Sequence, residues 1–281
     1  MLQMEVSTPV MGFGFGGALT LDGPNPVIDA MPNSLNFTIK GADKNLCNDI
    51  ADPDHPAIDG YDDPNASPPT HSVEDIISSL PRPDHYTGSG GTPSVQNGYA
   101  SLGESMGTPA GLESLINTIY NKTGANHYGN NPSSIALGDC PTHNTSDASC
   151  HTIIDYVEGD LTLNGNATGY GTLVVTGTLT MSGNFTWYGL VLVIGDGHME
   201  FNGGGNGQII GQLIDAKIWD SYTTKTKLSS LGSPTFKWNG GGVNAVQFDH
   251  CWSTKLMDAF NWTPPPTTKP LKVLSFRILP Y

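Results

Sequence analysis

Short segments in which apolar and polar residues alternate recur along the chain, and each ends in a polar residue followed by glycine. Alternation over such a short length is typical of a β-strand with one buried face. The closing glycine allows a turn conformation that other residues resist. The segments are ALTLDG (18–23), NFTIKG (36–41), DLTLNG (160–165), TLTMSG (178–183), HMEFNG (198–203) and the shorter FKWNG (236–240).

The first two segments start 18 residues apart, and so do the next two. A repeat of this period predicts a mainly β fold built as a parallel β-helix, a solenoid whose coils of about 18–20 residues stack on a continuous interior. Strand-like stretches at 171–177, 190–197 and 207–214 give each coil two or three short strands. One apolar residue of each repeated segment is expected to point inward, in register with the others: Leu21, Ile39, Leu163, Met181, Phe201 and Trp238.

The repeated pattern is interrupted between residues 44 and 151, which predicts an insertion within one composite domain. The first coils of the β-helix are then expected in residues 1–43, and its main part in residues 152–260. Residues 261–281 are expected to form a C-terminal extended segment and a final strand, which caps an exposed end of the solenoid.

Two helices are predicted within the insertion. Residues 72–80 form the first, with Ser72 as its N-cap. Residues 108–124 form the second, with Thr108 as its N-cap and Gly124 at its end. The second helix has one apolar face, which is expected to pack on the side of the β-helix. That face consists of Leu112, Leu115, Ile116, Ile119 and Tyr120.

The composition agrees with a fold of short strands and tight turns. Charged residues make up only 14% of the chain, which contains 35 Gly and 21 Pro. The formal net charge is −14, and only 12 Lys and Arg are present, which argues against binding to nucleic acid or to anionic membranes. An acidic chain suits binding of metal cations, although a solvated acidic surface is the simpler interpretation.

The four cysteines predict two disulfides and an oxidising compartment, and the sequence leaves three pairings open. They are Cys47, Cys140, Cys150 and Cys251. An alternative is a zinc site made of Cys140, His143, Cys150 and His151, although the spacing is not that of a zinc ribbon.

No stretch reaches the roughly 18 consecutive apolar residues of a membrane helix. The first 18 residues also lack the basic start and the continuous apolar run of a signal peptide. If the protein is exported, its signal is therefore expected to lie outside this sequence.

Four stretches carry a resemblance to a known family: LPRPDHYTGSGGTPSVQN (80–97), YGNNPSSIALGDCPTHNTSDASCHTIIDYVEGDLTLNGNATGYGTLVV (128–175), GNFTWYGLVLVIGDG (183–197) and KPLKVLSFRILPY (269–281). They resemble PilX-type, type IV pilus-associated proteins of soil bacteria, over nearly the whole chain after the first dozen residues. The resemblance implies an envelope or surface location, with other pilus or envelope proteins as partners. It supplies no catalytic residues, and the pilin-like hydrophobic helix usual in the family is not found in this sequence.

The segment DPDHPAIDGYDDPNAS (52–67) concentrates carboxylates beside turn-forming Pro and Gly. Calcium takes six to eight hard oxygen ligands from flexible loops of this kind. The candidate calcium ligands are Asp52, Asp54, Asp59, Asp62 and Asp63. The alternative is a solvated, turn-rich loop.

Common catalytic signatures are missing: the sequence contains no GxSxG, HExxH or Walker motif. Two pairs are candidates for acid–base catalysis, Asp196 with His198 and Asp249 with His250. Adjacent side chains on a strand point to opposite faces, so Asp249 and His250 cannot easily act together, whereas Asp196 and His198 can share a face. A structural role is the simpler interpretation of both pairs.

Aromatic residues offer a further binding surface. They can stack on sugars along a β-helix or fill the corners of its coils, and the second interpretation is preferred. They are Trp187, Tyr188, Trp219, Trp238, Trp252 and Trp262.

Three functions remain open from the sequence. The preferred one is an exported bacterial surface protein, pilus-associated and without enzymatic activity, which mediates adhesion or pilus assembly. The second is a calcium-dependent hydrolase on the same scaffold, acting on a polysaccharide or on a small ester or lactone. The third is a carbohydrate-binding module for an extracellular glycan.

Overall fold

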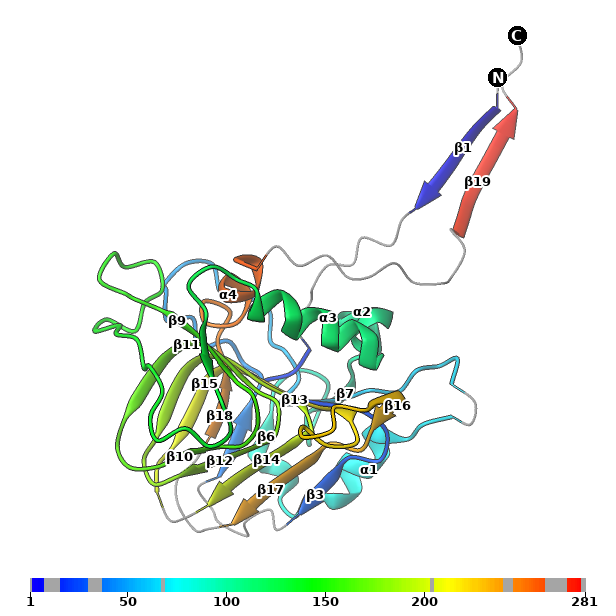
Figure 1. Ribbon diagram of the computed structural model, residues 1–281. Coiled ribbons are helices and arrows are strands. Elements are labelled where there is room, and N and C mark those ends of the chain that lie inside the picture. Colours follow the sequence, from blue (N-terminus) through cyan, green and yellow to red (C-terminus); the bar gives the residue numbers. More distant parts are fainter. Residues whose placement is uncertain are drawn as a thin grey trace.

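The computed structural model describes residues 2–7, 16–29, 37–66, 69–202, 205–239, 245–260 and 272–278. The protein is mainly β, with long parallel strands and few helices (Figure 1). Five strands form the smaller of two sheets in the body of the molecule. In spatial order they are β10 (Leu161–Leu163), β12 (Thr178–Ser182), β14 (His198–Asn202), β17 (Thr235–Asn239) and β3 (Val27–Asp29).

Twelve strands form the larger sheet. Its main path runs through β6 (Tyr86–Thr87), β4 (Thr38–Lys40), β18 (Ala245–Phe248), β15 (Gln208–Trp219), β13 (Thr186–Gly195), β11 (Thr168–Val175), β9 (Ile153–Val157) and β8 (Asn126–Tyr128). Beside this path lie β2 (Leu19–Asp22), β5 (Ile58–Gly60), β7 (Val95–Asn97) and β16 (Lys227–Gly232). Only β16 pairs antiparallel with its neighbour among the described strands of this sheet.

Between β9 and β18 the chain passes repeatedly from the larger sheet to the smaller one and back. Each return adds a strand parallel to the previous strand of the same sheet. In the smaller sheet, Leu163 is paired with Met181, Met181 with Phe201, and Phe201 with Trp238. All four side chains are buried, as the repeat predicted. This register position therefore carries one continuous row of apolar side chains into the core.

The N-terminal repeats lie elsewhere than expected. Leu21 and Ile39 are buried, but they belong to the larger sheet, where β2 pairs with the second half of β15 and β4 pairs with β18. The first strands of the chain thus stack beside the last strands of the body. The expectation failed because alternating apolar and polar residues identify a half-buried strand without saying which sheet contains it.

Three glycines lie at one level of the long strands of the larger sheet. Gly171 is paired with Gly189, and Gly189 with Gly211, and all three have positive φ angles of 136°, 142° and 135°. A Cβ atom on Gly189 would meet the carbonyl oxygen of Gly171, and one on Gly211 would meet that of Gly189. Only glycine fits this close backbone contact, so the row allows three neighbouring strands to approach one another closely at this level.

The helices lie mainly in residues 72–120. They are α1 (Ser72–Ser79), the short 3-10 helix η1 (Pro83–His85), α2 (Tyr99–Met106) and α3 (Pro109–Tyr120), with α4 (Thr254–Asp258) following β18. Leu112, Leu115, Ile116 and Ile119 of α3 are fully buried, and this helix packs on the larger sheet at β9, β13 and β15. The Thr108 hydroxyl accepts a hydrogen bond of 3.1 Å from the Gly111 N–H, which confirms the predicted N-cap. The helix ends at Tyr120, before Gly124.

The start of α1 differs from the prediction. The Ser72 hydroxyl donates to the carbonyl oxygens of Gly23 and Tyr61 instead of capping the helix. The Asp62 carboxylate accepts hydrogen bonds from the N–H groups of Ser72 (2.7 Å) and Val73 (3.1 Å). A carboxylate from ten residues upstream therefore satisfies the first turn.

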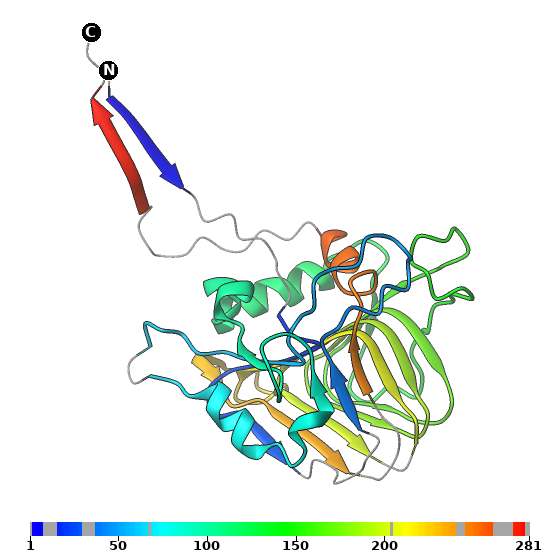
Figure 2. The same cartoon turned by 180° about the vertical axis from the view of Figure 1, so that it is seen from behind.

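The two terminal strands, β1 (Leu2–Ser7) and β19 (Lys272–Ile278), pair antiparallel with each other. Their ribbon lies apart from both sheets of the body (Figure 2). The C-terminal strand was expected to cap an end of the stacked strands and instead pairs with β1. No helix in the described part of the chain has the length and apolar character needed to cross a bilayer.

Candidate functional site

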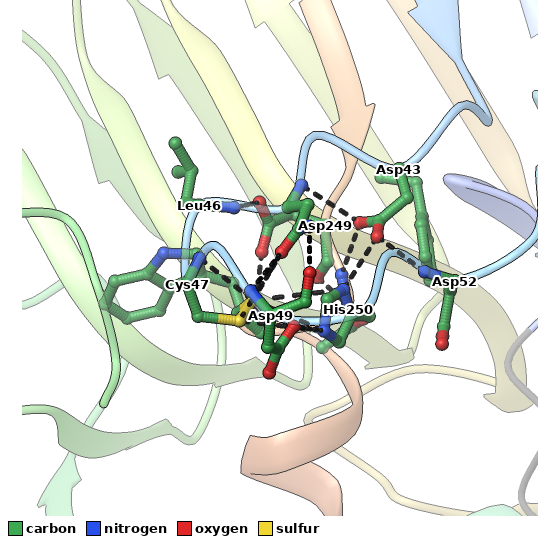
Figure 3. A network of polar contacts seen from close by, with 12 residues as sticks. Asp43, Leu46, Cys47, Asp49, Asp52, Asp249 and His250 are labelled. Carbon is green, nitrogen blue, oxygen red and sulfur yellow. Dashed lines mark hydrogen bonds and ion pairs between the residues drawn. A yellow bond between two sulfur atoms is a disulfide. The ribbon is translucent and has the colours of Figure 1, made fainter.

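Two loops from opposite ends of the chain meet at one edge of the larger sheet. Strand β4 pairs in parallel with β18, so residues 41–52 and 249–253 leave the sheet side by side. The Lys44 N–H donates to the carbonyl oxygen of Phe248 at 3.0 Å. Figure 3 shows the carboxylates, imidazole and sulfur atoms that the two loops bring together.

The His250 side chain is held between two carboxylates. Its Nδ1 lies 2.7 Å from Asp43 Oδ2, and its Nε2 lies 2.8 Å from Asp49 Oδ1 (Figure 3). Burial opposes protonation of the ring, but the two carboxylates outweigh it and raise the pKa of His250. Both ring nitrogens therefore lie within hydrogen-bond distance of a carboxylate, an arrangement that favours the cationic imidazole.

Asp43 is fixed by the backbone around it. Its side chain is 1% exposed, and it accepts hydrogen bonds from the N–H groups of Asn45, Asp52 and His250. Burial alone would favour the neutral acid, but these donors together with the His250 ring lower the pKa of Asp43. Asp43 is therefore an ionised carboxylate with a fixed orientation.

Asp249 has a separate structural role. It is fully buried, and its carboxylate accepts from the N–H groups of Leu46 (2.9 Å) and Trp252 (3.2 Å). Burial raises the pKa of Asp249, although these two donors oppose the shift. Asp249 joins the two loops, and the ring of His250 is engaged by other carboxylates, so the structure does not bring the two side chains together as an acid–base pair.

A disulfide between Cys47 and Cys251 closes the site. The two sulfur atoms lie 3.6 Å and 3.5 Å from His250 Nε2. The Cys47 N–H also donates to the sulfur of Cys251 at 3.2 Å. In the described part of the chain, Cys47, Asp49, His250 and Cys251 are the only group of three or more Cys, His, Asp or Glu whose ligand atoms all lie within 4.8 Å of one another.

The other predicted acid–base pair is not assembled. Asp196 follows β13 and His198 begins β14, and no hydrogen bond joins their side chains in the described structure. Burial raises the pKa of Asp196 and lowers that of His198. Each has one buried polar atom without a hydrogen-bond partner among the described residues, Asp196 Oδ1 and His198 Nε2.

The expected calcium ligands, Asp52, Asp54, Asp59, Asp62 and Asp63, do not converge. Asp59 is 1% exposed and accepts a hydrogen bond of 2.7 Å from the Gly17 N–H, whereas Asp62 holds the start of α1. No three of these five carboxylates form a close group in the described structure. Calcium binding by this segment would require a rearrangement, and it stays a prediction.

A cavity of about 420 Å³ lies beside the acidic segment. Tyr61 and Leu231 contribute apolar surface to it, and Asp63 and His71 contribute ionisable groups. Its volume lies within the range of small-molecule sites in proteins, roughly 300–1,000 Å³.

The second disulfide joins Cys140 and Cys150, ten residues apart. This bond replaces the zinc site considered for the same cysteines, and His143 instead stacks on Tyr188 with 4.5 Å between ring centroids. Two disulfides are typical of extracellular and periplasmic proteins.

The tryptophans fill the interior. Trp187, Trp219, Trp238 and Trp252 are at most 4% exposed, so they offer no sugar-stacking surface. Tyr188 is half-buried, and Trp262 lies outside the described residues.

Asp43 and Asp49 were not recognised from the sequence. They flank Cys47 in the stretch DKNLCND, and a pairing of Cys47 with Cys251 would have placed them beside His250. No protein-family model, curated protein or solved structure matches the chain.

Proposed function

We propose that this chain is an exported bacterial surface protein of the pilus-associated kind, a parallel β-helix that mediates adhesion or pilus assembly without catalysis. Three observations support the proposal. Successive parallel strands are 18 residues apart in register at Leu163 and Met181, two disulfides are present, and the sequence resembles PilX-type proteins.

The observation that carries the proposal is the outer face of the smaller sheet. Alternate residues of its strands point away from the core and are half-buried or exposed. One row runs through Thr162, Thr180, Glu200 and Lys237, a second through Thr178, His198 and Thr235, and a third through Ser182, Asn202 and Asn239. None of the described helices lies over the middle of this sheet in Figures 1 and 2.

This surface suits an uncharged, hydroxyl-rich partner. Thr, Ser and Asn side chains both donate and accept hydrogen bonds, as sugar hydroxyls do. The parallel strands repeat such groups about 4.8 Å apart. Lys237 and Glu200 form an ion pair of 3.1 Å, which leaves the face with little net charge. An extracellular glycan or a polar face of another pilus or envelope protein is the expected partner.

The test changes the face without changing the core. Thr162 and Thr180 are paired neighbours on it, so the variant Thr162→Arg/Thr180→Arg places two bulky cations there. We expect at least a tenfold loss of binding to a glycan array or to isolated type IV pili. Ser133→Arg/Ser134→Arg, at two exposed loop residues, is the matched control and should bind as the wild type does. If Thr162→Arg/Thr180→Arg binds as strongly as the wild type and the control do, the assignment of this face is refuted.

A second candidate function is hydrolysis of a polysaccharide, small ester or lactone, assisted by calcium. The cavity lined by Asp63, His71 and Tyr61 favours it, because a carboxylate and an imidazole line the same partly open cavity. Turnover on ester, lactone or glycan panels that requires calcium and is lost in His71→Gln would establish this function. No turnover with calcium or with chelator would exclude it for those substrates.

A further inference from the structure

We propose that Cys47, Cys251, His250 and Asp49 form a zinc site when the Cys47–Cys251 disulfide is reduced. The site lies where the loops after β4 and β18 meet (Figure 3). The proposal is independent of the function proposed above, because that function uses the outer face of the smaller sheet.

The distances from His250 Nε2 to the two sulfur atoms fit a tetrahedral ion. Zinc binds sulfur at about 2.3 Å and imidazole nitrogen at about 2.0–2.1 Å, which places a sulfur and a nitrogen ligand roughly 3.5 Å apart. The observed separations from Nε2 are 3.6 Å to Cys47 Sγ and 3.5 Å to Cys251 Sγ. Asp49 Oδ1, at 2.8 Å from the same nitrogen, supplies the fourth ligand. The two sulfur atoms have to separate, from about 2.0 Å in a disulfide to nearly 4 Å, and Asp49 Oδ1 has to withdraw from hydrogen-bond distance to roughly 3.3 Å from Nε2.

The surrounding groups are those that a zinc–histidine site requires. A metal-bound histidine normally donates its other ring N–H to a carboxylate, which fixes the ring. His250 Nδ1 does so to Asp43 at 2.7 Å, and three backbone N–H groups hold Asp43 in turn. The Cys47 N–H lies 3.2 Å from Cys251 Sγ, where it would stabilise a thiolate.

The charges favour zinc over a hard cation. Two thiolates and one carboxylate carry three negative charges, of which the ion neutralises two. The Lys255 ammonium, 3.2 Å from Asp49 Oδ2, offsets the remaining charge. Thiolate ligands select zinc over calcium or magnesium, which prefer oxygen.

The chemistry balances with an external thiol as reductant. Two thiol molecules reduce the disulfide to two cysteines and become one external disulfide. Zinc then displaces the protons of both cysteines and the proton on His250 Nε2. His250 therefore changes from donating a hydrogen bond to Asp49 to binding the ion beside it.

The experiment uses the full chain with Cys140→Ser/Cys150→Ser, so that Cys47 and Cys251 are its only cysteines. After reduction and removal of the reductant, Zn²⁺ is titrated against a chromogenic chelator, and Co²⁺ is used as a spectroscopic probe. We expect one Zn²⁺ per reduced chain, none in the oxidised chain, and thiolate-to-cobalt charge-transfer bands only after reduction.

Three further variants in the same background assign the ligands. His250→Gln should lose the tight site, and Asp43→Asn should weaken Zn²⁺ binding by about 10–100-fold as a positioning residue. His127→Gln, at an exposed residue remote from the site, should leave the affinity unchanged. Circular dichroism of the oxidised variants checks their folding.

Several results would overturn the proposal. One is a reduced parent chain that neither binds Zn²⁺ nor regains its fold on Zn²⁺ addition. Another is a Zn²⁺ affinity that His250→Gln leaves unchanged, because binding would then need only the two thiols. Equal binding by the oxidised and reduced chains would place the ion elsewhere.

Discussion

At the scale of single residues, Asp215 is an ionisable group placed in the apolar interior. In β15 it is paired with Val193 of β13 on one side and Leu21 of β2 on the other. The side chain is fully buried, and neither carboxylate oxygen has a hydrogen-bond partner among the described residues. Burial raises the pKa of Asp215 well above its usual value, so the residue is held as the neutral acid.

We expect Asp215→Asn to raise the free energy of unfolding at pH 7. Because the pKa of Asp215 is raised in the folded state, the folded chain keeps a proton that the unfolded chain releases above about pH 3.9. Stability of the wild type therefore falls as the pH rises from about 4 towards the folded-state pKa. The amide does not ionise, and its advantage at pH 7 should be roughly 1–3 kcal/mol, measured by urea unfolding.

The control for this measurement is Asp54→Asn, at an exposed carboxylate. Asp54→Asn should change the free energy of unfolding little at pH 7 or at low pH. The advantage of Asp215→Asn should shrink as the pH falls to about 4 and vanish about one pH unit below that, where the wild-type carboxyl is neutral in both states. A variant less stable than the wild type at pH 7 would mean that Asp215 is ionised and paired.

At the scale of elements, local sequence predicted those features that depend on neighbouring residues. The Thr108 cap and the buried face of α3 follow from residues within the helix itself. The cap of α1 could not be predicted from the helix sequence, because Asp62 is ten residues away and contacts Ser72 only in the folded chain. A tertiary contact there replaced the local cap that the sequence suggested.

Asp62→Ala should lower the free energy of unfolding by about 1 kcal/mol, the usual cost of losing a helix cap. The loss should be equal in calcium and in chelator, because the carboxylate binds two N–H groups of α1. Thermal melts with calcium and with chelator measure the loss, and Asp63→Ala, at the neighbouring carboxylate, is the control.

If the acidic segment does bind calcium, the ion should stabilise the wild type by about 2.7 kcal/mol at a hundredfold excess over Kd. A loss in Asp62→Ala that appears only with calcium would contradict the capping role.

The candidate site was predictable only in part. Cys47 and Cys251 were recognised as disulfide cysteines and His250 as a candidate for acid–base catalysis. Their meeting depends on β4 lying beside β18, which a strand pattern does not specify. Asp43 and Asp49 gave no signal of their own, because single carboxylates are common in an acidic chain.

At the scale of the whole molecule, the two ends of the chain complete one body. Strand β18 pairs with the first half of β15 and β2 pairs with its second half, so a C-terminal and an N-terminal strand share one position in the larger sheet. The smaller sheet also joins the two parts of the chain, because the N-terminal strand β3 pairs with the later strand β17. The spacing of the repeats predicted the stacking of strands but not this order, because the pattern is the same in every strand.

The disulfide between Cys47 and Cys251 fastens this closure across 204 residues of sequence. By chain entropy, a cross-link over so long a loop stabilises the folded state by about 5 kcal/mol, against about 3 kcal/mol for a loop of ten residues. Removing the Cys47–Cys251 pair should therefore destabilise the protein more than removing the Cys140–Cys150 pair.

The joining of the two chain ends is tested most directly by peptide mapping of the oxidised, unreduced protein by mass spectrometry. The peptide containing Cys47 should be recovered linked to the peptide containing Cys251, the Cys140 and Cys150 peptides should be linked to each other, and no free thiol should remain. Recovery of Cys47 linked to Cys140 or Cys150, or of four free thiols, would contradict the placement of the N-terminal strands beside the C-terminal ones.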